Sequence, residues 1–241
     1  MAELRVLIAA AGTGSRAGLP YPKTLHPVRG RPILLSLLGT LAPYDAEPTI
    51  IVSPSGEAPI RTTLEEAGVR AALVVQERPT GMGDAVLAAR LSPRFLPGAD
   101  LLLAWGDIPL LEEATIASLV ERHREAGNDF TFVSRPVDAA YTRVARDGEG
   151  RVTALEETRE LGVEPELGER DIGLFLFQAG LILDLLDHHR SEGLGRTTGE
   201  HGFLYIVAKA AAAGLKVEAL PIATEQDCIS LNRLSDLDPL A

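Results

Sequence analysis

The chain has 241 residues, of which 46% are hydrophobic, and a formal net charge of −11 at pH 7. This length and hydrophobic content suffice to bury one substantial core. The negative charge argues against nucleic acid or an anionic membrane as a partner, because both surfaces would repel the protein.

The first predicted strand, Val6–Ala10, is short and apolar and leads into a glycine-rich loop. Gly12 and Gly14 allow a tight turn whose amide groups can face phosphate oxygens. Arg16 follows on the same loop, and its guanidinium can bind two phosphate oxygens, while Lys23 supplies a compact ammonium. The alternative is a surface turn with solvated basic residues.

Apolar strand-like runs alternate with helical patterns along the rest of the chain. Further strands are predicted at Thr49–Val52, Ala71–Val75, Asp100–Ala104, Phe130–Val133 and Leu174–Phe177. Helices are predicted at Ile33–Leu41, Ile60–Ala67, Asp84–Leu91 and Glu113–Ala126. This alternation predicts a mixed or parallel sheet with helices on both faces, which binds ligands beyond the carboxyl ends of its strands.

Polar residues follow two of these strands. Gln76 carries a side-chain amide able to recognise a pyrimidine edge, and Gly81 permits close approach of the backbone to a base. Asp107 follows Gly106 at the end of an apolar strand, where a carboxylate can hold a magnesium ion between phosphate oxygens. The alternatives are a plain loop before a helix capped by Asp84 and, for Asp107, a helix cap.

Three of these segments carry a family resemblance. AAGTGSR (10–16) with PKTLHPVRGRPIL (22–34), QERPTGMGDA (76–85) and WGDIPLL (105–111) are similar to AAGxGTR…PKxLxPVxGxPxL, Q-x(4)-GTGxA and YGDxPLL of the sugar-1-phosphate nucleotidyltransferases. Within that family the motifs most resemble the uridylyltransferase domain of bacterial N-acetylglucosamine-1-phosphate uridylyltransferase. The resemblance implies a Rossmann-like α/β fold of the nucleotide-diphospho-sugar transferase type and a magnesium-dependent reaction that releases pyrophosphate.

Weaker similarities cover the second half of the chain. YTRV (141–144), VTALEE (152–157), DIG (171–173) and GE (199–200) stand where the family has YGRI, VTxIVE, NTG and the start of GEYY. The segment from Asp227 to Leu237 is similar to [EG]-x-VN-x(3)-[QD]L, whose asparagine joins the aspartate on the metal. Without the resemblance, Asn232 is more typical of a helix N-cap. The charged residues of the other segments are then as consistent with ordinary solvent-exposed side chains as with a binding role.

The resemblance implies the following roles. Arg16 and Lys23 are the catalytic residues, and Asp107 and Asn232 hold Mg²⁺. The implied nucleotide-binding residues are Ala10, Ala11, Gly12, Thr13, Gly14, Ser15, Gln76, Gly81 and Met82. The implied sugar-binding residues are Trp105, Thr142, Glu157, Asp171 and Glu200. We expect transfer by in-line attack of an anionic sugar-phosphate oxygen, which needs no general base, and none is assigned.

We expect one domain over residues 1–241, with a nucleotide-binding part at about 1–128, a sugar-binding part at about 129–222 and a metal-ligand segment at 223–241. The expected substrates are UTP and a sugar 1-phosphate. Two alternatives stay open: a catalytically silent nucleotide- or nucleotide-sugar-binding module, and a cytidylyl- or thymidylyltransferase acting on another phosphorylated alcohol. A nicotinamide-dependent dehydrogenase is disfavoured because Gly18 does not complete the GxGxxG spacing.

The remaining sequence features concern location and metal binding. Cys228 is the only cysteine, which excludes a disulfide framework and favours a reducing cytoplasm. We expect neither a signal peptide nor a membrane-spanning helix, because no apolar run is long enough. The five histidines show no metal-ligand spacing, and none is assigned a catalytic role. The oligomeric state is left open.

Overall fold

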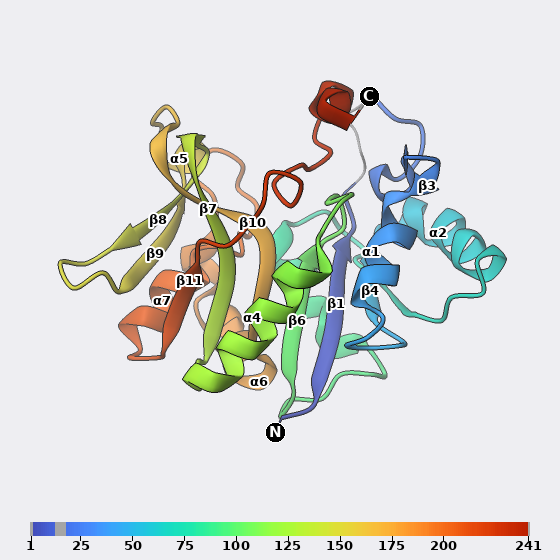
Figure 1. Cartoon of the computed structure of the whole chain (residues 1–241). Helices are drawn as coiled ribbons and strands as arrows, with labels where there is room; N and C mark the ends of the chain where they lie inside the picture. The colour runs from blue at the N-terminus through green and yellow to red at the C-terminus, as the bar shows by residue number, and fades with distance from the viewer. Residues whose placement is uncertain (1, 13–17, 241) are drawn as a thin grey trace.

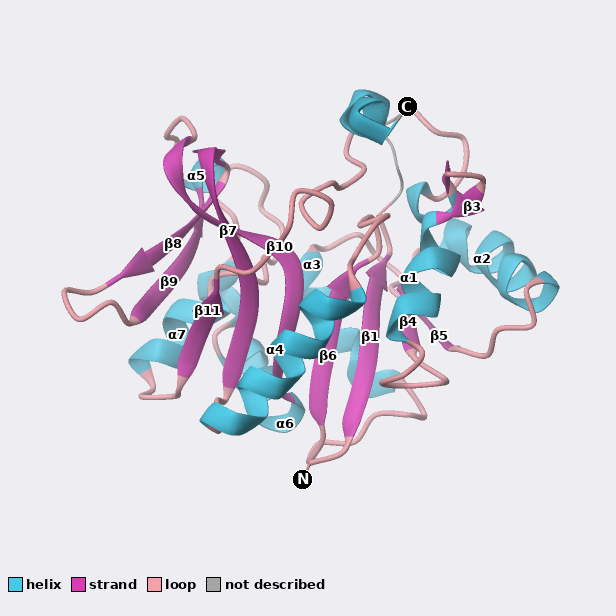
Figure 2. Cartoon of the chain, in the orientation of Figure 1, coloured by secondary structure: helices cyan, strands magenta, loops and turns pink. Residues whose placement is uncertain are grey.

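The computed structural model describes residues 2–12 and 18–240, with side chains described as far as residue 237. Its centre is a seven-stranded sheet (Figures 1 and 2). In spatial order the strands are β11 (Val217–Leu220), β7 (Phe130–Ala140), β10 (Glu166–Gln178), β6 (Asp100–Trp105), β1 (Leu4–Ala10), β4 (Thr49–Val52) and β5 (Ala72–Val75).

The sheet is mostly parallel, with one reversed strand. β1 pairs in parallel with β4 and β6, β4 with β5, and β11 with β7, whereas β10 is antiparallel to both β6 and β7. β7 leads to β10 through a small hairpin, β8 (Thr142–Arg146) and β9 (Val152–Glu157), and not through a long crossover helix. A strand that returns in this way runs antiparallel to the first. The predicted mixed, mostly parallel sheet is confirmed.

Helices cover both faces of the sheet, as predicted. Side chains alternate along each strand, so Val6 and Ile8 face one layer and Leu7 and Ala9 face the other. The first layer contains α1 (Ile33–Leu41), α2 (Pro54–Glu66) and α4 (Glu113–Ala126), of which α4 crosses in front of the sheet in Figure 1. The second contains α3 (Met82–Leu87), α6 (Ala179–His188) and α7 (Ile206–Ala212).

Short elements complete the described chain. They are η2 (Lys23–Leu25), β2 (Pro27–Val28), β3 (Arg31–Pro32), η3 (Ala88–Leu91), α5 (Thr158–Leu161), η4 (Arg190–Gly193) and η5 (Leu234–Leu240). The helix expected over Asp84–Leu91 is split, because α3 begins at Met82 and tightens into η3 after Leu87. α2 begins earlier than expected, because the Ser53 hydroxyl accepts the Gly56 N–H at 3.1 Å and caps the helix.

The C-terminal segment crosses the carboxyl ends of the strands, as the red trace in Figure 1 shows. Its Asp227 carboxylate is fully buried and accepts hydrogen bonds from Glu112 N at 2.8 Å and Thr115 Oγ1 at 2.7 Å, at the start of α4. Leu231 is also fully buried and packs with Val28 and Ile33. These contacts hold the segment over the strand ends.

Candidate active site

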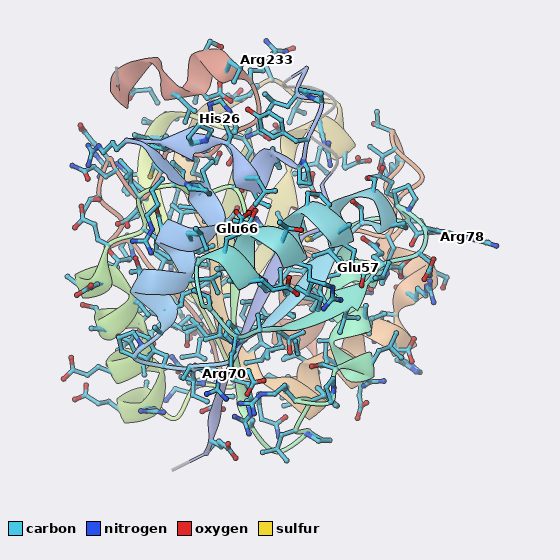
Figure 3. The ribbon with its side chains drawn as sticks, turned by 90° about the vertical axis from the view of Figure 1, so that its right-hand side faces the viewer. His26, Glu57, Glu66, Arg70, Arg78 and Arg233 are labelled. Atoms are coloured by element: carbon cyan, nitrogen blue, oxygen red, sulfur yellow. The ribbon has the colours of Figure 1, made fainter. Side chains whose placement is uncertain are left out.

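Three strands end at one edge of the sheet, and a predicted site residue follows each of them. Gly12 comes after β1, Gln76 after β5 and Asp107 after β6. Parallel strands of α/β sheets present bound ligands at this edge. Arg233, from the C-terminal segment, and His26, from the segment after η2, lie at the same end of the molecule in Figure 3.

Lys23 lies between the ends of β1 and β6. It is carried there by η2, which begins directly after Pro22. Its Nζ forms an ion pair with Oδ2 of Asp107, and a Cβ built on Gly12 would lie 3.2 Å from its Cε. The Lys23 and Asp107 side chains are only 22% and 13% exposed, so solvent screens this pair less than an open surface pair. Gly12, Lys23 and Asp107 therefore form one cluster.

Gly106 determines how closely Asp107 approaches β1. The Gly106 N–H donates to Ala9 O at 2.9 Å, and a Cβ at this position would also lie 2.9 Å from that oxygen. A side chain here would push the strand ends apart. Among the described residues, Oδ1 of Asp107 is buried and has no hydrogen-bond partner. Because an unpaired buried carboxylate oxygen is costly, this atom is suited to bind a cation.

Part of the predicted phosphate loop lies outside the described residues, namely Thr13, Gly14, Ser15 and Arg16. Their roles stay predictions. Ala10 is buried at the end of β1, and Ala11 packs against the apolar layer that contains α3, α6 and α7. Both have apolar side chains, so their contribution to phosphate binding is limited to the backbone.

Asn232 directly follows a residue that is hydrogen-bonded to Asp107. Its neighbour Leu231 donates its N–H to the Asp107 carbonyl at 2.9 Å. The exposed Asn232 side chain donates from Nδ2 to Ser230 Oγ at 3.2 Å, which leaves the amide oxygen as an acceptor. Over the described residues, no group of three or more His, Cys, Asp or Glu side chains is arranged to hold a metal ion. The Asp107 and Asn232 pair stays a prediction.

The predicted base-binding loop is folded back on itself. Gln76 donates from Nε2 to the Gly81 carbonyl at 3.0 Å, so these two residues come together as expected. Met82 packs its side chain against the apolar layer that contains α3, α6 and α7. Arg78, at the loop's outer side, points away from the protein (Figure 3). The loop is thus anchored at Gln76 and Met82, and its contact with a base is untested.

His201 clamps this loop, which the sequence analysis did not anticipate. His201 N donates to Thr80 O, and Gly83 N donates to His201 O, each at 2.8 Å. Gly81 has a φ of 118°, and a Cβ there would lie 2.3 Å from His201 O. The His201 ring, 1% exposed, contacts Asp84 Oδ1 at 2.7 Å. The only sequence signal was that this residue departs from the family's GEYY segment.

The charge of Asp84 stabilises the clamp. Burial raises the pKa of Asp84, but hydrogen bonds from Thr80 and His201 and the positive charges of His201 and Arg190 outweigh burial, so the pKa lies below its ordinary value. Arg190 reaches Asp84 Oδ1 at 2.9 Å. The second ring nitrogen of His201 contacts Tyr205 Oη at 3.0 Å.

Three of the predicted sugar-binding residues lie together. Thr142 donates from Oγ1 to Asp171 Oδ1 at 2.6 Å, and Thr142 faces Glu157 across the β8–β9 hairpin. Gly173 N donates to the other Asp171 oxygen at 2.9 Å. Burial raises the pKa values of Asp171 and Glu157, opposed at Asp171 by these hydrogen bonds and at Glu157 by Arg159. The two departures from the family pattern, Thr142 and Asp171, are partners in one buried hydrogen bond.

Trp105 and Glu200 have different surroundings. The Trp105 ring packs against Phe175 and Phe203 at centroid distances of 5.0 and 5.8 Å, and a Cβ on Gly173 would overlap the indole. Trp105 therefore lies between the end of β6 and the irregular part of β10 that follows Asp171. Glu200 is exposed, and within the described residues its side chain contacts none of the other predicted sugar-binding residues.

The fold and the cluster at its strand ends define an α/β protein of the nucleotide-binding type. The chain belongs to the MobA-like NTP transferase domain family, whose profile matches residues 6–201. This confirms the resemblance on which the site was predicted.

Several known proteins are similar over nearly the whole chain. The bifunctional protein GlmU of Syntrophotalea carbinolica is 28% identical over 232 residues, and that of Alkalilimnicola ehrlichii is 31% identical over 233 residues. Both alignments cover 95% of this chain but only 49% and 48% of the relative, so the chain spans about half the length of these relatives.

A solved structure supports the fold. A protein of Bacillus anthracis assigned as a glucose-1-phosphate thymidylyltransferase superposes with a TM-score of 0.75 at 18% identity, covering 98% of this chain and 93% of that one. None of the helices in the described part of the chain has the length and apolar character needed to span a membrane.

Proposed function

We propose that this protein transfers a nucleotidyl group from a pyrimidine nucleoside triphosphate, with UTP as the expected donor, to a sugar 1-phosphate. The observation that carries the proposal is the contact of Lys23 with both Gly12 and Asp107 at the ends of two neighbouring parallel strands. A compact cation there lies beside the backbone that would receive the phosphates. The family membership and the relatives named GlmU support the same reaction class.

The reaction balances without a general base. An anionic oxygen of the acceptor phosphate attacks the α-phosphorus, the bond from that phosphorus to its β-bridging oxygen breaks, and pyrophosphate leaves with the electron pair. Lys23 would then neutralise charge on the transferring phosphate, and the backbone around Gly12 would orient the triphosphate. Positioning and charge neutralisation are the main contributions expected from the protein in this class of reaction.

A magnesium ion fits the residues present. Oδ1 of Asp107, which accepts no hydrogen bond from the described residues, offers a hard oxygen ligand, and the Asn232 amide oxygen is the second protein donor we propose. Mg²⁺ keeps few protein ligands and takes the rest from water and phosphate, so two donors suffice. When bound, the ion supplies charge neutralisation and orientation of phosphate oxygens. Among the described residues, Lys23 is the cation paired with Asp107.

The proposal is tested by measuring pyrophosphate release for UTP, dTTP and CTP against a set of sugar 1-phosphates, with Mg²⁺ and with excess chelator. We expect metal-dependent release for at least one combination, with UTP preferred. Asp107→Asn should abolish it while leaving the fold intact by circular dichroism. A well-folded protein that binds triphosphates but releases no pyrophosphate with any pair would instead be a catalytically silent binding module.

A further inference from the structure

A cavity of about 450 Å³ opens beside Asn232, between the C-terminal segment on one side and Tyr141, which joins β7 to β8, and β10 on the other. Among its lining residues are Tyr141, Arg170, Cys228 and Arg233. Leu231, which lies between the lining residues Ser230 and Asn232, donates a hydrogen bond from its N–H to the Asp107 carbonyl. The cavity therefore adjoins the Lys23–Asp107 cluster. Its size is sufficient for a phosphorylated sugar.

Arg170 is held in place without a carboxylate partner. Its Nη2 donates to Cys228 O at 3.0 Å, and its Cζ lies 4.7 Å from the centre of the Tyr141 ring. No acidic side chain of the described residues forms an ion pair with it. The Cys228 carbonyl and the Tyr141 ring therefore hold the Arg170 guanidinium at the cavity.

Arg233 adds a second unneutralised charge. Asp236, the acidic residue in the cavity wall, accepts the backbone N–H groups of Asn232 at 2.9 Å and Arg233 at 2.6 Å with one of its oxygens. Within the described part of the chain, the Arg233 guanidinium is in no ion pair. Two arginines and one aspartate leave the cavity with a net positive charge in a protein whose net charge is −11.

Covalent chemistry at Cys228 does not explain the cavity. Burial raises the pKa of the Cys228 thiol, although Arg170 opposes this shift. A thiol kept neutral is a poor nucleophile. The chemistry that the cavity presents is the recognition of an anion by guanidinium groups.

We propose that Arg170 and Arg233 form an anion-binding subsite for the acceptor, a phosphorylated sugar or polyol. The inference rests on the proposed nucleotidyl transfer and names how the acceptor is held. The anion is either the reacting phosphate or a second acidic group on the acceptor, such as a carboxylate. A guanidinium already aligned by Tyr141 and Cys228 O loses little freedom on binding either of them.

The test measures binding without turnover, so that failure of catalysis does not obscure it. The whole protein is titrated calorimetrically, at low salt and without triphosphate, with glucose 1-phosphate, glucuronic acid 1-phosphate and glucose. The variants are Arg170→Gln and Arg233→Gln. The matched control is Arg143→Gln, because Arg143 is an exposed arginine of β8 that pairs with Glu156 at 2.9 Å and does not line the cavity.

We expect both acids to bind better than glucose, and each cavity variant to weaken the binding of acids by about tenfold, as for loss of a charged hydrogen bond. Equal weakening of both acids identifies the reacting phosphate, and selective weakening of glucuronic acid 1-phosphate identifies a second acidic group. The proposal is overturned if the unsubstituted protein binds neither acid, if glucose binds as well as the acids, or if the cavity variants behave like Arg143→Gln.

Discussion

At the scale of single residues, Lys23 carries the strongest functional assignment. Its ammonium is paired with Asp107 and lies against Gly12. We expect Lys23→Ala to lower turnover by about 100-fold or more, because a preorganised charge at the reacting phosphate is lost. The free energy of unfolding should fall by only about 1–3 kcal/mol, the cost of leaving the Asp107 carboxylate without its partner.

Pyrophosphate release and urea denaturation, measured on the same preparation, separate these two effects of Lys23→Ala. Lys209→Ala is the control, because Lys209 also forms an ion pair, with Glu192, but lies on α7 away from the strand ends. Normal turnover by a folded Lys23→Ala protein would remove the basis of the proposed function.

Thr142 and Asp171 form the second residue-scale feature. Thr142→Val keeps the shape of the side chain but leaves a buried carboxylate oxygen without its donor. We expect a loss of about 1–3 kcal/mol in the free energy of unfolding, measured in urea at pH 7. Thr142→Ser should restore most of it. Thr153→Val, at an exposed position of β9, is the matched control, and an equal effect of both valine substitutions would contradict the assigned contact.

At the scale of elements, the predicted base-binding loop and the start of α3 pack so closely against His201 that Gly81 and Gly83 have no room for a side chain. A Cβ on Gly83 would lie 2.2 Å from Gly202 O and 2.8 Å from the His201 ring. Gly83→Ala should therefore displace the start of α3 and raise the KM for the triphosphate more than it lowers kcat. Gly98→Ala is the control, since a Cβ there meets no atom within 4 Å. Unchanged kinetics in Gly83→Ala would show that the clamp does not position the loop.

The same clamp predicts a response to acid. Because the folded-state pKa of Asp84 is lowered from its ordinary 3.8, its contribution to stability is fully present above that value and is lost as pH falls through the lower, folded-state value. The difference in unfolding free energy between the unsubstituted protein and Asp84→Asn should be constant from neutral pH to about pH 5 and shrink below about pH 4. Asp138→Asn, at an exposed position of β7, should show no such change. A difference independent of pH would exclude Asp84 as the titrating group.

The elements also show how far the sequence was informative. Thr49–Val52 and Glu113–Ala126 have the predicted bounds, because each combines a clear apolar period with an evident stop. β8 and β9 were not predicted as strands, although the alternation of buried and exposed positions in β8 is typical of a half-buried strand. β10 begins at Glu166, well before the predicted start at Leu174, because its first residues are mostly charged or glycine and carry no apolar run. Pattern reasoning finds buried segments and misses strands that leave the core.

The candidate site also combines residues that the sequence places together with contacts that only the structure shows. Gly12 and Asp107 could be placed together because both follow buried parallel strands, and Lys23 because its motif is specific. The His201 clamp could not, because it depends on backbone groups of residues far apart in the chain. Arg170 is likewise recognisable only once β10 and the C-terminal segment are seen side by side.

At the scale of the whole molecule, the segment that follows β1 and the C-terminal segment lie together at the candidate site, beyond the carboxyl ends of the strands. The N-terminal part supplies Gly12 and Lys23, and the C-terminal segment supplies Asn232 and Arg233. Asp227 ties that segment to α4, whose own N-cap residue makes no side-chain capping bond. The segment also brings Arg233 to a protein that is otherwise strongly acidic. We therefore expect an anionic substrate to be attracted where the segment after β1 and the C-terminal segment come together.

This arrangement predicts that the C-terminal segment is needed for transfer and not for the sheet. Truncation after Asp227 keeps the bonds to α4 but removes Leu231, Asn232 and Arg233. The last of the seven strands in chain order, β11, ends at Leu220, so we expect native-like circular dichroism. Loss of the buried Leu231 should lower the melting temperature. The triphosphate should still bind through the loops after β1 and β5. Pyrophosphate release should be lost. Asn232→Ala in the full chain separates loss of one oxygen donor from loss of the segment, and a truncated protein that still releases pyrophosphate would show that the segment only covers the site.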